Sequence, residues 1–84
     1  QRNGVYYNLG LLEYKNKKYD QSLIYFSKIY TKYPKSTYAS RSLLYIARSI
    51  NAMGKKDEAN ASFQQLLDKY PKSKQVKYAK KEMI

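Results

Sequence analysis

Apolar and small residues recur at intervals of three and four along the first third of the chain. In the second stretch of this kind they stand at Leu23, Phe26, Ile29 and Tyr30, and in the first at Tyr6, Leu9, Gly10 and Tyr14. This spacing places them on one face of an α-helix, with polar side chains on the other. The pattern predicts two amphipathic helices, over about residues 4–16 and 19–32.

The same pattern returns 37 residues later, measured from Pro34 to Pro71. The pentapeptide KYPKS occurs at 32–36 and again at 69–73, and Gly10 falls on Ala47 under this shift. A fixed period of this size is typical of a repeat architecture. A small residue such as Gly10 also lets two packed helices approach closely. Each period is therefore predicted to be one helical hairpin.

The repeated pentapeptide has the residues that end one helix and begin the next. Pro34 disfavours helical geometry at Tyr33, so the second helix is expected to stop there. Ser36 is expected to cap the following helix by accepting a backbone N–H of its first turn, and Ser73 to do the same in the second copy. KYPKS is thus interpreted as the boundary between hairpins.

These residues resemble the tetratricopeptide repeat, whose pattern is W-x2-L-G-x2-Y, then A-x3-F, then P. The matching residues of the two units are Tyr6, Leu9, Gly10, Ser22, Phe26 and Pro34, then Leu43, Ile46, Ala47, Ile50, Gly54, Ala59, Phe63 and Pro71. The departures in the first unit include Glu13, which stands where the family favours Tyr and has Tyr14 beside it, and Ser22, which replaces Ala.

The resemblance implies an all-α fold, a right-handed α-solenoid of two helix-turn-helix hairpins with a C-terminal capping helix. We expect a single domain over 1–84, with repeat 1 at about 3–36, repeat 2 at about 37–72 and the capping helix at about 73–84. Because about three repeats are usually needed for stability, we also expect a fragment of a longer protein, with either further repeats or self-association covering the first hairpin.

The period exceeds the usual ~34 residues of the family by three. We expect these residues in the first helix of the second unit, which would begin early and run about a turn longer. This variant, with YPKSKQVKYAKK closing the chain, resembles the C-terminal repeat domain of the Tol-Pal-associated periplasmic cell-division coordinators and the outer-membrane assembly lipoproteins. That resemblance implies a periplasmic protein that binds envelope components; a cytoplasmic adaptor remains the alternative.

Scaffolds of this family bind a partner segment in a concave groove lined by the first helix of each hairpin. Counted along the family pattern, the groove-facing residues are Tyr7, Leu11, Tyr14, Arg41, Leu44, Arg48 and Asn51, with Tyr78 and Lys81 on the last helix extending the wall. Rings and guanidinium groups suit a protein or peptide that is partly apolar and carries carboxylates. The alternative is that Tyr7 and Leu11 pack against neighbouring helices and that the arginines are only solvated.

Composition narrows the function classes. The chain has no His and no Cys, and its six carboxylates are scattered, so no catalytic constellation, metal site or cofactor site is predicted. No apolar run is long enough to span a membrane. The net charge of +11 leaves a basic helical-repeat nucleic-acid binder as a further alternative. It is disfavoured because the lysines concentrate on loops and second helices, away from the expected groove.

Overall fold

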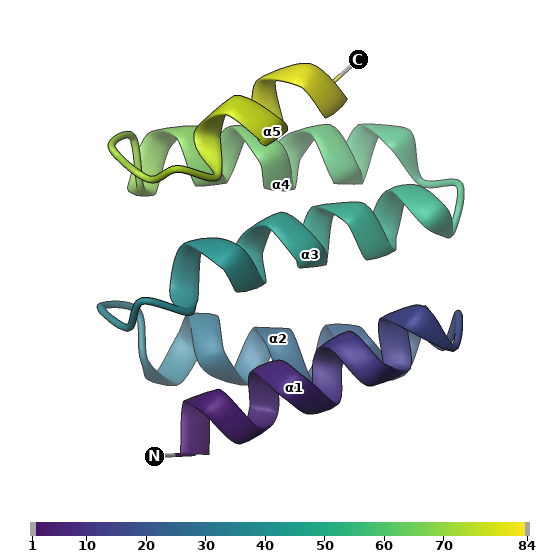
Figure 1. Ribbon diagram of the computed structural model, residues 1–84. Helices are drawn as coiled ribbons and strands as arrows, with labels where there is room; N and C mark the ends of the chain where they lie inside the picture. Colours follow the sequence, from purple (N-terminus) through teal and green to yellow (C-terminus); the bar gives the residue numbers. More distant parts are fainter. Residues whose placement is uncertain (1, 84) are drawn as a thin grey trace.

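Five helices follow one another along the computed structural model, which describes residues 2–83 (Figure 1). They are α1 (Arg2–Lys15), α2 (Tyr19–Lys32), α3 (Ala39–Ala52), α4 (Lys56–Lys69) and α5 (Val76–Glu82). No strand occurs among the described residues, and none of these helices is both long and apolar enough to cross a membrane. The predicted all-α fold is confirmed, and α2 has the predicted bounds.

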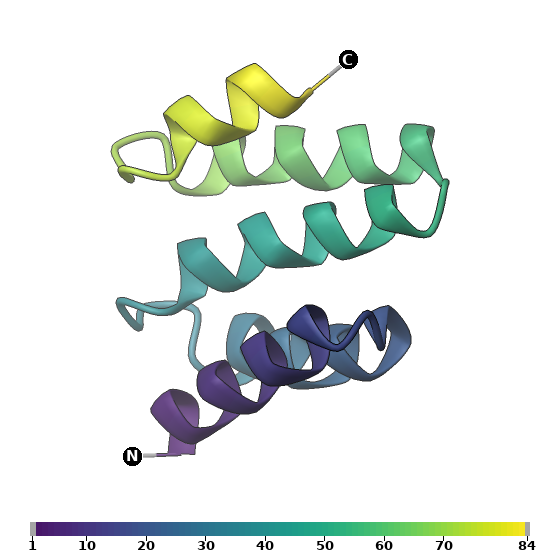
Figure 2. The same ribbon diagram turned by 45° about the vertical axis from the view of Figure 1, so that its right-hand side comes forward.

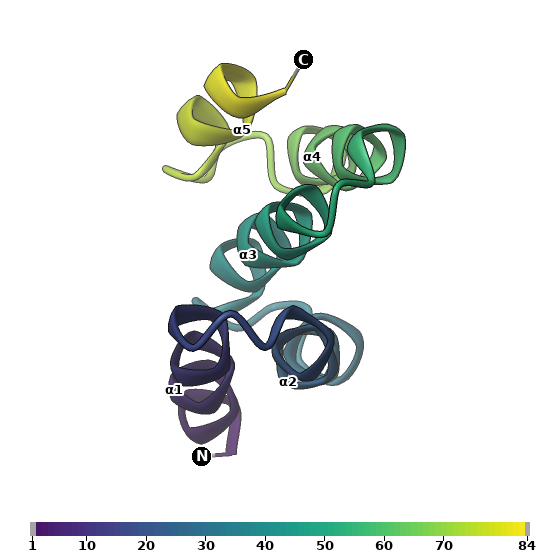
Figure 3. The ribbon, with the colours of Figure 1, turned by 90° about the vertical axis from the view of Figure 1, so that its right-hand side faces the viewer.

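The helices form two antiparallel hairpins stacked as a solenoid, in which each helix packs mainly against its neighbours in the chain. Figure 2 shows this order from α1 at one end to α5 at the other. Viewed along the helices in Figure 3, α1, α3 and α5 lie along one side, and α2 and α4 lie along the other. The first helices of successive units therefore form one continuous layer, as the resemblance implied.

The core lies between the two layers and repeats with the period of the sequence. Phe26 and Phe63, 37 residues apart, are almost completely buried, together with Leu43 and Leu66. Gly10 packs directly on Phe26, because a Cβ built at Gly10 would lie 2.7 Å from the ring carbon Cε1. The close approach expected from a small residue at position 10 is therefore present between α1 and α2.

The two hairpin turns share one backbone geometry. At the end of α1, Lys18 N–H donates to the Glu13 carbonyl (2.9 Å) and Lys17 N–H to the Tyr14 carbonyl (3.0 Å). This pair of bonds is the Schellman motif, which needs a left-handed residue after the helix. That residue is Lys17 (φ 63°) in the first turn and Gly54 (φ 83°) in the second. Position 17 thus holds a side chain where the repeat partner has glycine.

The expectation of a longer helix in the second unit is wrong. α3 begins at Ala39 and has 14 residues, the same length as α2 and α4. The extra residues lie instead in the connections between hairpins, residues 33–38 and 70–75, where the proline stops one helix and a turn precedes the next. The terminal helix is also shorter than expected, since it begins at Val76 instead of about residue 73; the last expected residue, 84, lies outside the described residues.

The prediction that the serines of KYPKS cap the following helices is wrong, because they bond within the turns that precede these helices. Ser36 Oγ accepts the N–H of Tyr38 (3.0 Å), which precedes α3, and Ser73 Oγ accepts the N–H of Gln75 (3.0 Å), which precedes α5. Each serine therefore shapes the turn that leads into the helix and does not cap the helix itself. The Ser36 hydroxyl also donates to Asn3 Oδ1 on α1 (2.8 Å), which joins the connection to the first helix.

Candidate functional site

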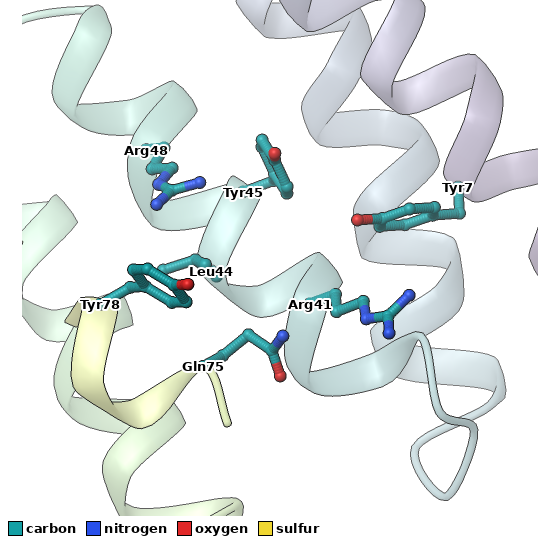
Figure 4. Close-up of a pocket in the computed structure, with 7 residues that line it drawn as sticks. All are labelled: Tyr7, Arg41, Leu44, Tyr45, Arg48, Gln75 and Tyr78. Atoms are coloured by element: carbon teal, nitrogen blue, oxygen red, sulfur yellow. The ribbon is translucent and has the colours of Figure 1, made fainter. Parts of the chain in front are cut away.

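A pocket of about 460 Å³ opens on the layer formed by α1, α3 and α5 (Figure 4). Its lining residues are Tyr7 from α1, Arg41, Leu44, Tyr45 and Arg48 from α3, Gln75 from the turn before α5, and Tyr78 from α5. Arg41, Tyr45 and Arg48 are spaced by four and three residues, so they share one face of α3. The solenoid brings them together with side chains that lie 27 to 41 residues away in the chain.

Five of the nine residues predicted for the groove line this pocket, and they are Tyr7, Arg41, Leu44, Arg48 and Tyr78. Leu44 is only 4% exposed, so it forms part of the core beneath the pocket. Tyr78 is 40% exposed and offers its ring to the surface.

The other four predicted residues lie elsewhere. Leu11 packs against the core, as the alternative of helix packing anticipated. Tyr14 places its ring 5.2 Å from Tyr45 and 5.5 Å from Tyr19, beside the pocket and not in its lining. Asn51 and Lys81 do not line the pocket either. The residues predicted from helical spacing therefore cover a wider surface than the pocket itself.

Counting along the family pattern missed two lining residues, Tyr45 and Gln75. Tyr45 could have been found from its spacing, because it lies four residues after Arg41 on the same face. Gln75 had no local signal, since it belongs to a connection that only the stacking of α5 brings to α3.

Aromatic rings form the α1 side of the pocket. The Tyr7 ring centroid lies 4.9 Å from that of Tyr38, 5.9 Å from Phe26 and 6.3 Å from Tyr45. Phe26 and Tyr45 stack with centroids 5.4 Å apart. Partial burial raises the pKa of Tyr7 and of Tyr14 above the ordinary value of 10.0. These hydroxyls therefore stay neutral and can donate or accept hydrogen bonds at the rim.

The two arginines of the pocket differ in their partners. Arg48 Nε donates to Glu82 Oε1 (2.9 Å) and Arg48 Nη2 to Glu82 Oε2 (2.6 Å), a two-point ion pair that links α3 to α5. The hydrogen bond to Glu82 raises the pKa of Arg48 further. Arg41 is exposed, lies 6.0 Å from the Tyr38 ring centroid and forms no ion pair within residues 2–83.

No cluster of His, Cys, Asp and Glu that could hold a metal ion occurs within the described part of the chain. The pocket offers rings, one paired guanidinium, one unpaired guanidinium and an amide. This set of groups can bind a polypeptide segment through stacking, apolar contact and charge-assisted hydrogen bonds.

The fold and the pocket together define a helical-hairpin repeat scaffold. A comparison with protein families matches the tetratricopeptide repeat at residues 5–36 and 41–73, which is most of the chain. The chain belongs to the tetratricopeptide repeat family, whose members generally mediate protein–protein interactions and are typically non-catalytic. A comparison with curated proteins finds no match.

Proposed function

We propose that this domain is a scaffold that binds an extended or helical segment of a partner protein in the pocket of the α1, α3 and α5 layer. The observation that carries the proposal is the pocket itself, a hollow of about 460 Å³ lined by the exposed ring of Tyr78, the half-buried rings of Tyr7 and Tyr45, and a guanidinium group without a carboxylate. We propose a partner segment that is partly apolar and bears acidic residues, because such a segment complements both features.

We place this scaffold in a bacterial cell envelope, in the manner of the Tol-Pal-associated cell-division proteins. The support is the 37-residue period with its YPKS connections and the basic terminal helix. The compartment can be tested by osmotic shock of cells that naturally produce the protein. Release with the periplasmic fraction agrees with the proposal, whereas retention in the cytoplasm favours a cytoplasmic adaptor.

Site-specific photo-cross-linking in the same cells tests the binding site. A photoreactive phenylalanine at Tyr78, in the pocket, is compared with one at Ile24, which is 52% exposed on α2 and does not line it. We expect a protein adduct from position 78 only, and we expect Arg41→Glu to abolish it. Lys56→Glu, an exposed charge change on α4, is the matched control and should leave the adduct intact. An adduct that survives Arg41→Glu would place the working surface outside the pocket.

The nucleic-acid alternative receives less support from the charge distribution. None of the lining residues is a lysine, and one of the two lining arginines is already neutralised by Glu82. Phosphate contacts from many cations dominate nucleic-acid affinity. The basic surface lies outside the pocket that the proposal uses.

Self-association is a second candidate function, favoured by an exposed apolar face on α1. Val5 is 56% exposed and Leu12 is 55% exposed. Leu12 corresponds by the repeat period to Ser49, which is buried and lies 3.0 Å from Ser22 of the preceding hairpin, Oγ to Oγ. A second copy could cover α1 as α2 covers α3. Sedimentation velocity of the protein beside Leu12→Ser should then show a dimer that the substitution dissociates, and a monomer at all concentrations would exclude it.

A further inference from the structure

Positive charge is concentrated at one end of the solenoid. Figures 1 and 2 show the two connections between hairpins, residues 33–38 and 70–75, at one end and the two hairpin turns, residues 16–18 and 53–55, at the other. The connections and the four residues on either side of each contain seven Lys and Arg and one carboxylate, Asp68. The turns and their flanking residues, counted in the same way, contain five lysines and four carboxylates. The first end, which we call the connection end, is therefore strongly basic, whereas the second is nearly neutral.

The charge of the connection end is not cancelled within the domain. Its exposed lysines are Lys32, Lys35, Lys69, Lys72, Lys74 and Lys77. Within residues 2–83 none of them forms an ion pair. Asp68 instead accepts a hydrogen bond from Gln64, one turn back along α4 (Gln64 Nε2 to Asp68 Oδ1, 3.0 Å). Because unpaired surface cations attract anions, this end favours an anionic partner.

Hydrogen bonds hold the two connections together as one surface. The Tyr70 hydroxyl donates to the Pro34 carbonyl (2.7 Å), so the second KYPKS segment is bonded directly to the first. Ser40 Oγ of α3 donates to Gln75 Oε1 in the second connection (3.1 Å). The lysines therefore stand on a fixed backbone, and little backbone order has to be imposed when a partner binds.

A lysine-lined hollow lies beside each connection. The volumes are about 460 Å³ at the first and about 360 Å³ at the second. Each lining includes an exposed proline, Pro34 or Pro71, and at least two lysines. Neither hollow shares a residue with the pocket on the layer of α1, α3 and α5. The connection end is thus a second surface of the domain, made of two similar units that the repeat relates.

The features of this end favour a flat anionic surface over a nucleic acid. Single-stranded nucleic acids bind in grooves where their bases stack on exposed rings. Here the rings of Tyr33, Tyr38 and Tyr70 are half-buried, and no arginine lies in either connection. Lysines act as point charges and attract anionic phospholipids near a membrane surface without a defined geometry. Figure 1 shows that both connections project beyond the helices, so one plane can contact both.

We propose that the connection end binds the surface of a membrane that contains anionic phospholipids, with the lysines of both KYPKS segments at the headgroup phosphates. This inference does not depend on the partner proposed for the pocket. The helices run from the connection end to the hairpin turns, so they point away from the bound membrane. The pocket lies on the side of this stack and stays open to a partner protein.

Co-sedimentation with vesicles tests the proposal. One set of vesicles contains only phosphatidylcholine, and in the other about one third is replaced by phosphatidylglycerol, which is anionic. We expect saturable binding to the anionic vesicles alone at an ionic strength of about 0.1 M. Lys35→Gln combined with Lys72→Gln should weaken this binding about 20-fold, because each lysine near an anionic surface contributes about fivefold.

The matched control is Lys15→Gln combined with Lys56→Gln. These exposed lysines lie beside the hairpin turns, and this variant has the same net charge as the first. A 14-residue helix is about 21 Å long, so the turns lie about two Debye lengths from a membrane at the connection end. We therefore expect this variant to weaken binding by less than about threefold. Circular dichroism verifies that each variant is folded.

Tryptophan fluorescence reports the orientation of the bound domain, because the chain has no Trp of its own. Thr37→Trp places a probe in the first connection, and Asn16→Trp places one in a hairpin turn; both positions are exposed. Anionic vesicles should shift the emission of the first probe to shorter wavelength and leave the emission of the second unchanged.

Binding to both kinds of vesicle, or to neither, would overturn the inference. Equal weakening by the two lysine pairs, or an emission shift of the probe at position 16, would overturn it by assigning the binding to net charge instead of the connection end. Tighter binding of a single-stranded oligonucleotide than of anionic vesicles, at equal phosphate concentration, would assign the surface to nucleic acid. The cross-link at position 78 tests the pocket separately from all of these results.

Discussion

The junction between α1 and α3 is made of aromatic rings, whereas the equivalent junction between α3 and α5 is made of an ion pair. The repeat period relates Leu11 to Arg48 and Tyr45 to Glu82. In the first junction Tyr45 packs against Tyr7 and Tyr14 of α1; in the second, Glu82 binds Arg48. Positions 45 and 82, which the repeat makes equivalent, thus carry two different interactions.

The difference explains the shape and polarity of the pocket. Ring packing removes apolar area from water and adds edge-to-face contacts, so it stabilises the contact between α1 and α3. The ion pair is directional and partly exposed, so it positions α5 but adds little stability. Because the pocket spans both junctions, one of its walls is aromatic and the other is charged.

Removing the central ring of the aromatic junction should have the largest effect. Tyr45→Ala deletes stacking with Phe26 and edge contacts with Tyr7 and Tyr14. We expect the free energy of unfolding to fall by about 2–4 kcal/mol, a large fraction of the stability of a domain this small. Urea unfolding followed by circular dichroism measures it. Tyr78→Ala, at the charged junction, is the control and should cost less than about 1 kcal/mol; equal losses would contradict the comparison.

The contact between Gly10 and Phe26 adjoins the aromatic junction, because Phe26 also stacks on Tyr45. Gly10→Ala places a methyl group 2.7 Å from a ring that has no room to move, although alanine favours the helix by about 1 kcal/mol. Because overpacking costs about 1–3 kcal/mol, we expect a net loss of roughly 1 kcal/mol. Thermal unfolding checks the sign. A stabilised variant would mean that α1 can shift away from α2, and Phe26→Leu combined with Gly10→Ala should recover part of the loss.

The turn before the second helix offers a stabilising change in the first hairpin. Lys17→Gly relieves the left-handed backbone of a residue with a Cβ and should raise the free energy of unfolding by about 0.5–1 kcal/mol. Gly54→Ala, the mirror change in the second hairpin, should lower it by about 1 kcal/mol. Urea midpoints of the two variants should move in opposite directions. Movement in one direction for both would show that the turns are not equivalent.

Breaking the ion pair should affect α5 alone. We expect Glu82→Gln to lower the overall free energy of unfolding by less than about 1 kcal/mol, because the pair is partly exposed. Hydrogen exchange should nevertheless accelerate at the amides of Ala79 and Met83, which bond within and just after α5. The amides of α1 to α4 serve as the internal control. Unchanged exchange in α5 would mean that apolar contact with α4, and not Arg48, holds the helix.

Alkaline pH should weaken the aromatic junction and leave the ion pair intact. Burial raises the pKa of Tyr7 and Tyr14, so their contribution to stability is fully present below the unfolded value of 10.0 and is lost as pH rises through the higher folded value. Arg48 has a raised pKa and stays charged in this range. We expect a small decrease of the melting temperature above about pH 10, reduced in Tyr7→Phe. An equal decrease in that variant would assign the effect to other groups.

The elements of this fold follow from local chemistry that is visible in the sequence. The spacing of Phe26, Ile29 and their partners determined the helices, and Pro34 and Pro71 determined where α2 and α4 stop, since a 3.6-residue period and a missing backbone N–H act over a few residues. The 37-residue repeat then determined that hairpins follow one another.

The chemistry of the pocket required the tertiary structure. Leu44 and Arg48 were both expected to face the groove, but stacking buried the first and paired the second with Glu82, 34 residues away in the chain. It also left Arg41 exposed and brought Gln75 into the lining of the pocket. Helical periodicity specifies which face of a helix a residue occupies, while the partner across that face depends on how hairpins stack, because the groups that meet there are distant in sequence.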